Sequence, residues 1–133
     1  MGDSTEFFIR ILADFSQLRG RMKSVVQILR SGFPSASVQH SIDFVTYDAR
    51  HVIEIFIDIA LGAGKSFCWW IDVERVGQVW KVEASLRRDE GAGEDSLWKA
   101  TYKATTVEEL FSHLSTVLDE IERFANQKGE HFI

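Results

Sequence analysis

The stretch FCWWIDVERVGQVWKVEASLR, residues 67–87, alternates apolar and polar side chains on both sides of a Val76-Gly77 pair. A period of two is the pattern of a half-buried β-strand, and a glycine between two such runs indicates a hairpin. Successive strand side chains point to opposite faces of a sheet, so Trp69 and Trp70 must lie on different faces. We expect Trp69 to enter the core and Trp70 to stand on the second face.

The same period of two covers the middle of the chain. The turn lengths also predict the pairing of the strands: a Gly62-Ala63-Gly64 loop sets Ile57 opposite Trp69, and a Val76-Gly77 turn sets Val73 opposite Trp80. Connections this short force antiparallel neighbours, because a parallel crossover needs about a dozen residues or more. The expected strands are residues 37–47, 52–60, 67–75, 78–87 and 97–104.

Two helices are expected to flank these strands. The first helix is expected over residues 3–30, and Gly32 and Pro34 are the signal that ends it. The second is expected over residues 107–127, directly after Thr106, which forms a capping box with Glu109. The apolar stripe of the first helix is Phe8, Ile11, Leu12, Phe15, Leu18, Met22, Val25, Val26 and Leu29, and that of the second is Val107, Leu110, Phe111, Leu114, Val117, Leu118, Ile121 and Phe124. The prediction is a single α+β domain over residues 1–133. In the order α-β-β-β-β-β-α, the N- and C-terminal helices pack on one face of a five-stranded antiparallel meander.

Composition narrows the functional classes. The chain has 133 residues, 45% hydrophobic and 26% charged, with a formal net charge of −5. This acidity argues against a nucleic-acid binder, which needs a clustered basic face. No apolar run has the length of a membrane span, and the start MGDSTEFF lacks the features of a secretory signal. A single cysteine, Cys68, forms no internal disulfide, and we expect a cytoplasmic protein.

The second face of the sheet collects charged side chains around two aromatic ones. We expect Phe56 and Trp70 to be cross-strand neighbours, with Glu54 opposite Asp72, and Lys99 and Lys103 at the far side. An antiparallel sheet often leaves one face to water, which is the simpler interpretation. The alternative is a recognition patch with an apolar centre and a charged rim. Its partner-binding residues would be Asp43, Glu54, Phe56, Asp58, Trp70, Asp72, Glu74 and Glu83.

Motifs for catalysis, cofactors or metals are weak in this chain. The segment GAGKS resembles a phosphate loop but lacks its first glycine and leads into a strand, so a hairpin turn is the better interpretation. No histidine has metal-ligand spacing, and His113 is expected to be solvated. Carboxylates on an open sheet have nothing to raise their pKa for acid–base catalysis. We therefore predict no enzyme activity, no cofactor and no metal site.

The stretch WWIDVERVGQVWKVEASL, followed by a strand and the capped helix TTVEELFSHLSTVLDEI, resembles small bacterial immunity proteins of polymorphic toxin systems. The resemblance implies a compact, acidic α+β domain that binds and neutralises a cognate toxin. We expect it to bind a basic toxin domain through the acidic and aromatic face, or through the DEGAGED loop of residues 89–95 beside that face. The resemblance is one of architecture and general sequence character and includes no diagnostic motif, so it assigns no residue a role.

Three alternatives stay open. One is a secretion chaperone, although type III secretion chaperones place a helix within the strand order and this chain does not. Another is a homodimer joined through the open face. The last is an enzyme or a small-ligand binder with a pocket between the helices and the sheet.

Overall fold

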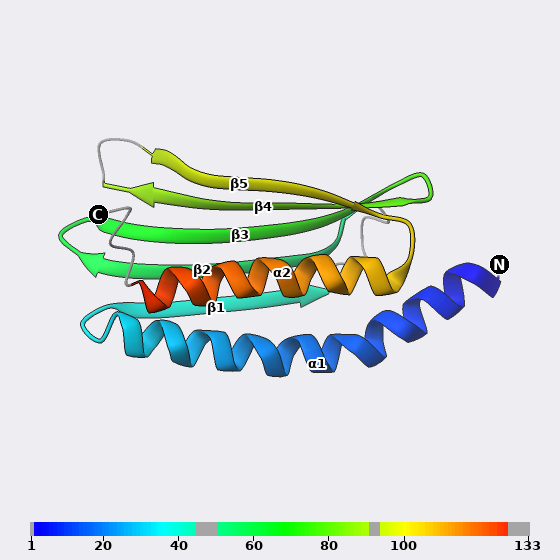
Figure 1. The fold of residues 1–133 in the computed structure, drawn as a ribbon, viewed down its shortest axis with the longest axis horizontal. Helices are drawn as coiled ribbons and strands as arrows, with labels where there is room; N and C mark the ends of the chain where they lie inside the picture. The colour runs from blue at the N-terminus through cyan, green and yellow to red at the C-terminus, as the bar shows by residue number, and fades with distance from the viewer. Residues whose placement is uncertain (1, 45–50, 91–93, 128–133) are drawn as a thin grey trace.

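The computed structural model describes the backbone of residues 2–44, 51–90 and 94–127 and the side chains of residues 16–43, 53–90 and 95–127. The elements are α1 (Gly2–Gly32), β1 (Ser37–Phe44), β2 (His51–Gly62), β3 (Lys65–Val76), β4 (Val79–Asp89), β5 (Glu94–Ala104) and α2 (Val107–Asn126). All five strands form one antiparallel sheet in chain order (Figure 1). The predicted α+β meander with a helix at each end is confirmed, while residues 45–47 of the first expected strand lie outside the described part.

Both helices pack on the same face of the sheet, as predicted. Figure 1 shows α2 in front of the strands and α1 beside it along β1. Every described position of the two expected apolar stripes is buried, except Phe111, which is half-buried. The first four positions of the α1 stripe lie outside the described side chains. The helices share one hydrophobic core with the inward side chains of the strands, such as Ile57, Trp69 and Val82.

The helix ends follow the local signals in the sequence. The Thr106 hydroxyl accepts a hydrogen bond from the Glu109 backbone N–H at 3.2 Å, which confirms the predicted cap of α2. At the other end of the core, α1 finishes at Gly32, where a Cβ atom would lie 2.6 Å from the carbonyl oxygen of Ala125. A glycine there lets the two helices approach closely. None of the described helices carries an apolar stretch long enough to span a membrane.

The predicted register between β2 and β3 is confirmed, although the turn differs. Ile57 lies opposite Trp69 and Glu54 opposite Asp72. The loop is the two-residue Ala63-Gly64 turn, with φ values of 55° and 75°, and a bulge lies between Ala60 and Gly62. Positive φ at both loop residues is typical of a type I′ hairpin turn. The bulge restores the pairing that a three-residue loop would have produced.

The predicted register between β3 and β4 is wrong by two residues. Val73 lies opposite Val82, and Trp80 lies opposite Arg75, whose guanidinium sits 4.7 Å from the Trp80 ring centroid. The loop begins one residue later than expected, at Gly77, whose φ is +65°. Tight hairpin turns need a positive φ at their first loop residue, which the β-branched Val76 avoids and glycine accepts. A shift of two residues keeps every side chain on its predicted face.

Candidate functional site

The sheet face that points away from the helices, here called the outer face, carries all eight side chains that the sequence predicts for partner binding. They occupy alternate positions of β1 to β4, and the positions between them on β2 to β4 point towards the helices. The eight are Asp43, Glu54, Phe56, Asp58, Trp70, Asp72, Glu74 and Glu83. The structure therefore brings these residues together on one surface.

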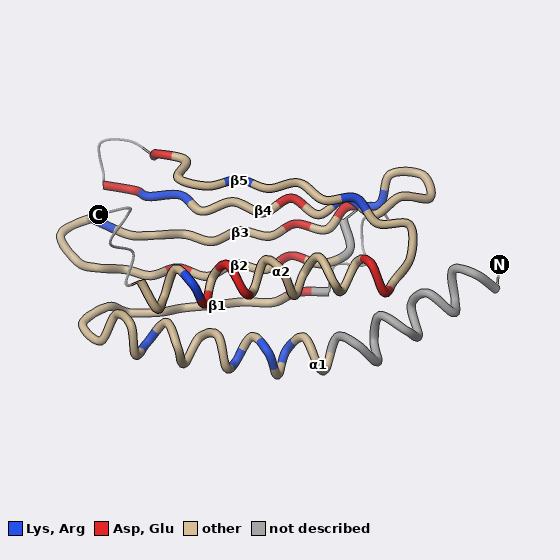
Figure 2. The backbone as a smooth tube through the Cα atoms, in the orientation of Figure 1, with Lys and Arg blue, Asp and Glu red and all other residues tan. Residues whose placement is uncertain are grey.

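Four carboxylates form a line across four adjacent strands, which we call the acidic row. Asp43 lies opposite Glu54, Glu54 opposite Asp72, and Asp72 opposite Glu83. Figure 2 shows the acidic segments of β1 to β4 aligned across the sheet. Like charges directly opposite one another destabilise a sheet. Lys81 offsets part of this repulsion through an ion pair with Glu83 at 2.7 Å.

An aromatic pair lies beside the acidic row. Phe56 and Trp70 are opposite each other on β2 and β3, with ring centroids 6.4 Å apart in an edge-to-face arrangement. Phe56 is 37% exposed and Trp70 is 46% exposed. They belong to a second line of residues across the sheet, here called the central row: Ser41, Phe56, Trp70, Ser85 and Lys99.

The opposite assignment of the two adjacent tryptophans is confirmed. Trp69 is 2% exposed, and its ring packs against Trp98 and Phe124 at centroid distances of 5.5 and 5.6 Å. Trp70 points to the outer face instead. Consecutive residues of one strand thus serve the core and the exposed surface separately.

Four of the eight predicted residues, Glu54, Asp58, Asp72 and Glu74, are less accessible than an open face suggests. Burial raises the pKa of the Asp58 carboxyl above its ordinary value, because the ionised form loses solvation. Glu74 is only 9% exposed and lies opposite Lys81. Glu74 therefore offers little surface to a partner. In the acidic row, Asp43 and Glu83 are exposed, while Glu54 and Asp72 are half-buried.

Basic side chains gather on the β4 and β5 side of the outer face, as the sequence predicted. Arg87, Lys99 and Lys103 lie there, and Lys103 is opposite Lys81. A depression of about 500 Å³ runs between the two charged regions. Its lining includes Glu54, Trp70, Asp72, Glu83, Arg87 and Lys99. The outer face is thus a shallow, polarised surface with an apolar centre.

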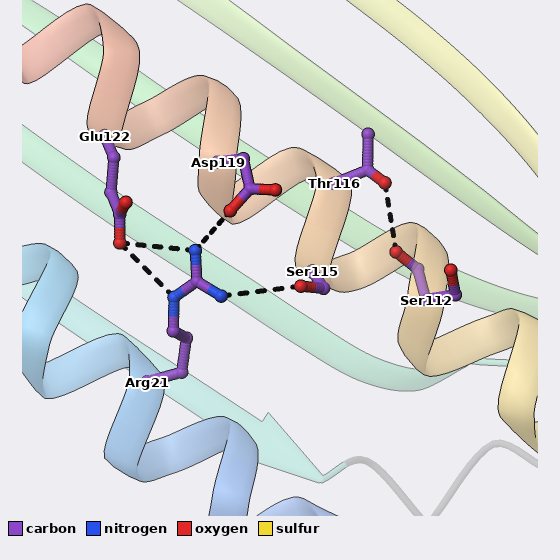
Figure 3. Close-up of polar contacts among 6 residues, drawn as sticks. All are labelled: Arg21, Ser112, Ser115, Thr116, Asp119 and Glu122. Carbon is purple, nitrogen blue, oxygen red and sulfur yellow. Dashed lines mark hydrogen bonds and ion pairs between the residues drawn. The ribbon is translucent and has the colours of Figure 1, made fainter.

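A polar cluster between the helices was not foreseen from the sequence. Arg21 of α1 reaches α2, where its guanidinium contacts Asp119 at 2.5 Å, Glu122 at 3.2 and 3.3 Å, and Ser115 at 3.4 Å (Figure 3). The hydrogen bond to Asp119 raises the pKa of Arg21, as does the charge of Glu122. No local pattern marks this cluster, because its members are about a hundred residues apart in the chain. It links the two helices on the side away from the outer face.

His113 is only partly solvated and makes contacts that were not predicted. Its ring is half-buried, stacks on Tyr102 at a centroid distance of 4.9 Å, and places Nε2 3.0 Å from the carbonyl oxygen of Lys103. His113 therefore ties α2 to β5. The GAGKS segment forms the β2–β3 turn and the start of β3. Within the described residues, no three His, Cys, Asp or Glu side chains are grouped to hold a metal ion.

Fold and surface together define a class: an α+β protein whose sheet has one helix-covered face and one charged face with aromatic side chains at its centre. No protein-family model, curated protein or solved structure matches the chain.

Proposed function

We propose that the chain is a non-enzymatic protein-binding domain that recognises a basic partner through its outer face. The observation that carries the proposal is the position of the exposed Phe56 and Trp70 directly beside the acidic row. Interface centres are enriched in aromatic residues, which supply most of the binding energy when buried. Complementary charges around them speed encounter and select the partner.

The partner that fits best is a basic toxin domain, and the chain then acts as its immunity protein. Support comes from the resemblance in architecture to small acidic immunity proteins, together with the four carboxylates that lie opposite one another across β1 to β4. A binder of this kind neutralises a toxin by covering its surface and needs no chemistry of its own. The outer face supplies the aromatic anchors and the charge for such covering.

The test is rescue of growth. The chain is expressed together with the toxin-like C-terminal domain encoded by a neighbouring gene of its source organism, and survival is scored. Wild-type protein should restore growth, whereas Phe56→Ala and Trp70→Ala should lose most of the protection. Leu61→Ala is the matched control for Phe56→Ala, because both side chains are 37% exposed.

Circular dichroism of the purified variants establishes that they remain folded. Full protection by folded Phe56→Ala and Trp70→Ala proteins would overturn the proposed role of the outer face. Absence of protection by the wild-type chain against that domain would overturn its role as the immunity protein for that toxin.

A further inference from the structure

The outer face presents two parallel lines of different chemistry. The acidic row and the central row are two residues apart along every strand that they cross, which corresponds to about 6.7 Å. Glu54 precedes Phe56 by two residues on β2, and Trp70 precedes Asp72 by two on β3. Both lines run across the strands. Phe56 and Trp70 are the apolar members of the central row, so a matching partner must carry apolar side chains beside a basic stripe.

The spacing of the acidic row favours an α-helix as the matching element. Neighbouring strands are about 4.8 Å apart, so the four carboxylates span roughly 14 Å. Four side chains on one face of a helix, one per turn of 5.4 Å, span about 16 Å. Four on one face of a strand span about 20 Å. The spacing of side chains along a helix therefore matches the spacing of the acidic row, whereas the spacing along a strand is too long.

We infer that the outer face receives a basic amphipathic α-helix of the partner, laid across the strands. Its Lys and Arg side chains contact the acidic row, and its apolar side chains contact Phe56 and Trp70. The depression between the acidic and basic regions, lined by Glu54, Trp70 and Asp72 among others, gives room to the side chains that contact Trp70. This inference rests on the proposed function, since it names the element of the partner that the face recognises.

A second copy of the chain on the same face would bring like charges of the acidic row together. In a face-to-face dimer with its twofold axis along β3, Asp72 would meet its own copy and Glu54 would meet the other subunit's copy of Glu83. With the axis across the strands at the central row, Glu54 would meet the other subunit's copy of Asp58. Juxtaposed like charges suppress an interface. The acidic row by itself therefore favours a basic partner over a second copy, although the same axis along β3 would set Asp58 against the other subunit's copy of Arg87.

The test uses two synthetic peptides of the same Arg and Leu composition. Each is about 14 residues long, because a helix rises 1.5 Å per residue and must span the acidic row. One places Arg and Leu in adjacent helical stripes and is locked as a helix by a side-chain cross-link; the other alternates them with the period of a strand. Affinities for the full chain are measured by calorimetry.

We expect the helical peptide to bind at least about tenfold more tightly than the alternating one, since only its repeat matches the row. Glu54→Gln and Trp70→Ala should each weaken its binding severalfold. The control variants Glu120→Gln, on α2, and Leu61→Ala, near the end of β2, should leave its affinity unchanged. Equal or tighter binding of the alternating peptide, or no effect of Glu54→Gln and Trp70→Ala, would overturn the inference. The inference would also be overturned if the wild-type protein dimerised with rising concentration while the Trp70→Ala variant stayed monomeric.

The two proposals fail separately. If rescue of growth depends on Phe56 and Trp70 while the peptides show no preference for the helix, the partner uses another element and only the helix inference falls. If rescue does not depend on those residues, the proposed function of the outer face falls, whatever the peptides do.

Discussion

Phe56 and Trp70 lie directly opposite each other on β2 and β3, with their ring planes at 87° and both rings partly exposed. Edge-to-face pairs of this kind add roughly 0.5–1.5 kcal/mol beyond area burial. The pair is thus held in place by its own contact before any partner arrives. A surface that is ordered in the free protein loses less entropy on binding.

The two adjacent tryptophans should respond differently to truncation. Trp69→Ala removes a fully packed ring and should lower the free energy of unfolding by about 3–5 kcal/mol. Trp70→Ala removes a ring that is 46% exposed and should cost far less. Urea unfolding of both variants measures the difference. A larger loss for Trp70→Ala would show that the two faces have been exchanged.

The acidic row should cost stability in the free protein. Glu54 is flanked by Asp43 and Asp72, so Glu54→Gln should raise the free energy of unfolding by roughly 0.2–1 kcal/mol. The same change should weaken binding of a basic partner. Thermal unfolding measures the expected gain in stability, and the peptide affinities measure the expected loss of binding. A variant that loses stability would show that Glu54 makes a favourable contact in the sheet.

Asp58 should make stability depend on pH. Its pKa is raised in the folded state above the ordinary value of 3.8, so folding favours the protonated acid. The contribution is present below that ordinary value and is lost as pH rises through the raised pKa. Asp58→Asn should therefore gain stability over the wild type as pH increases from about 4 to 7. Chemical unfolding of both proteins across this range measures the gap, and a gap that narrows with rising pH would contradict the assignment.

Arg21 should couple the two helices. A double-mutant cycle of Arg21→Met and Asp119→Asn should give a coupling energy of roughly 0.2–1 kcal/mol, because both side chains remain partly exposed. The coupling should decrease in about 1 M NaCl, where screening is strong. Additive effects at low salt would show that the contact adds nothing to stability.

Gly32 should be intolerant of a side chain. A Cβ atom there would lie 2.6 Å from a backbone oxygen of α2, so Gly32→Ala should lower stability by about 1–3 kcal/mol through overpacking. Gly20→Ala is the matched control in the same helix, since nothing lies within 4 Å of its added Cβ. That control should gain up to about 1 kcal/mol from helix propensity. Equal effects at both positions would contradict the close approach of α1 and α2.

Local patterns in the sequence were enough for the element order, the helix cap and the face of every strand residue discussed. Alternation separates Trp69 from Trp70 without any knowledge of their neighbours, because it is a property of the strand backbone. The loop around Gly62-Ala63-Gly64 also predicted the β2–β3 pairing. Contacts between distant segments, such as Arg21 with Asp119 or His113 with Tyr102, left no local trace.

Local patterns predicted which residues share the outer face but not which of them lie opposite one another. Alternation alone determined that Glu54, Trp70, Asp72 and Glu83 share one face. The predicted β3–β4 register would have set Asp72 opposite Lys81, an ordinary ion pair. In the tertiary structure the positive φ of Gly77 moves the turn, and Asp72 meets Glu83 instead. Which face a side chain takes depends on the parity of its position, whereas which charge it meets depends on the exact pairing, and only the folded turn decides that pairing.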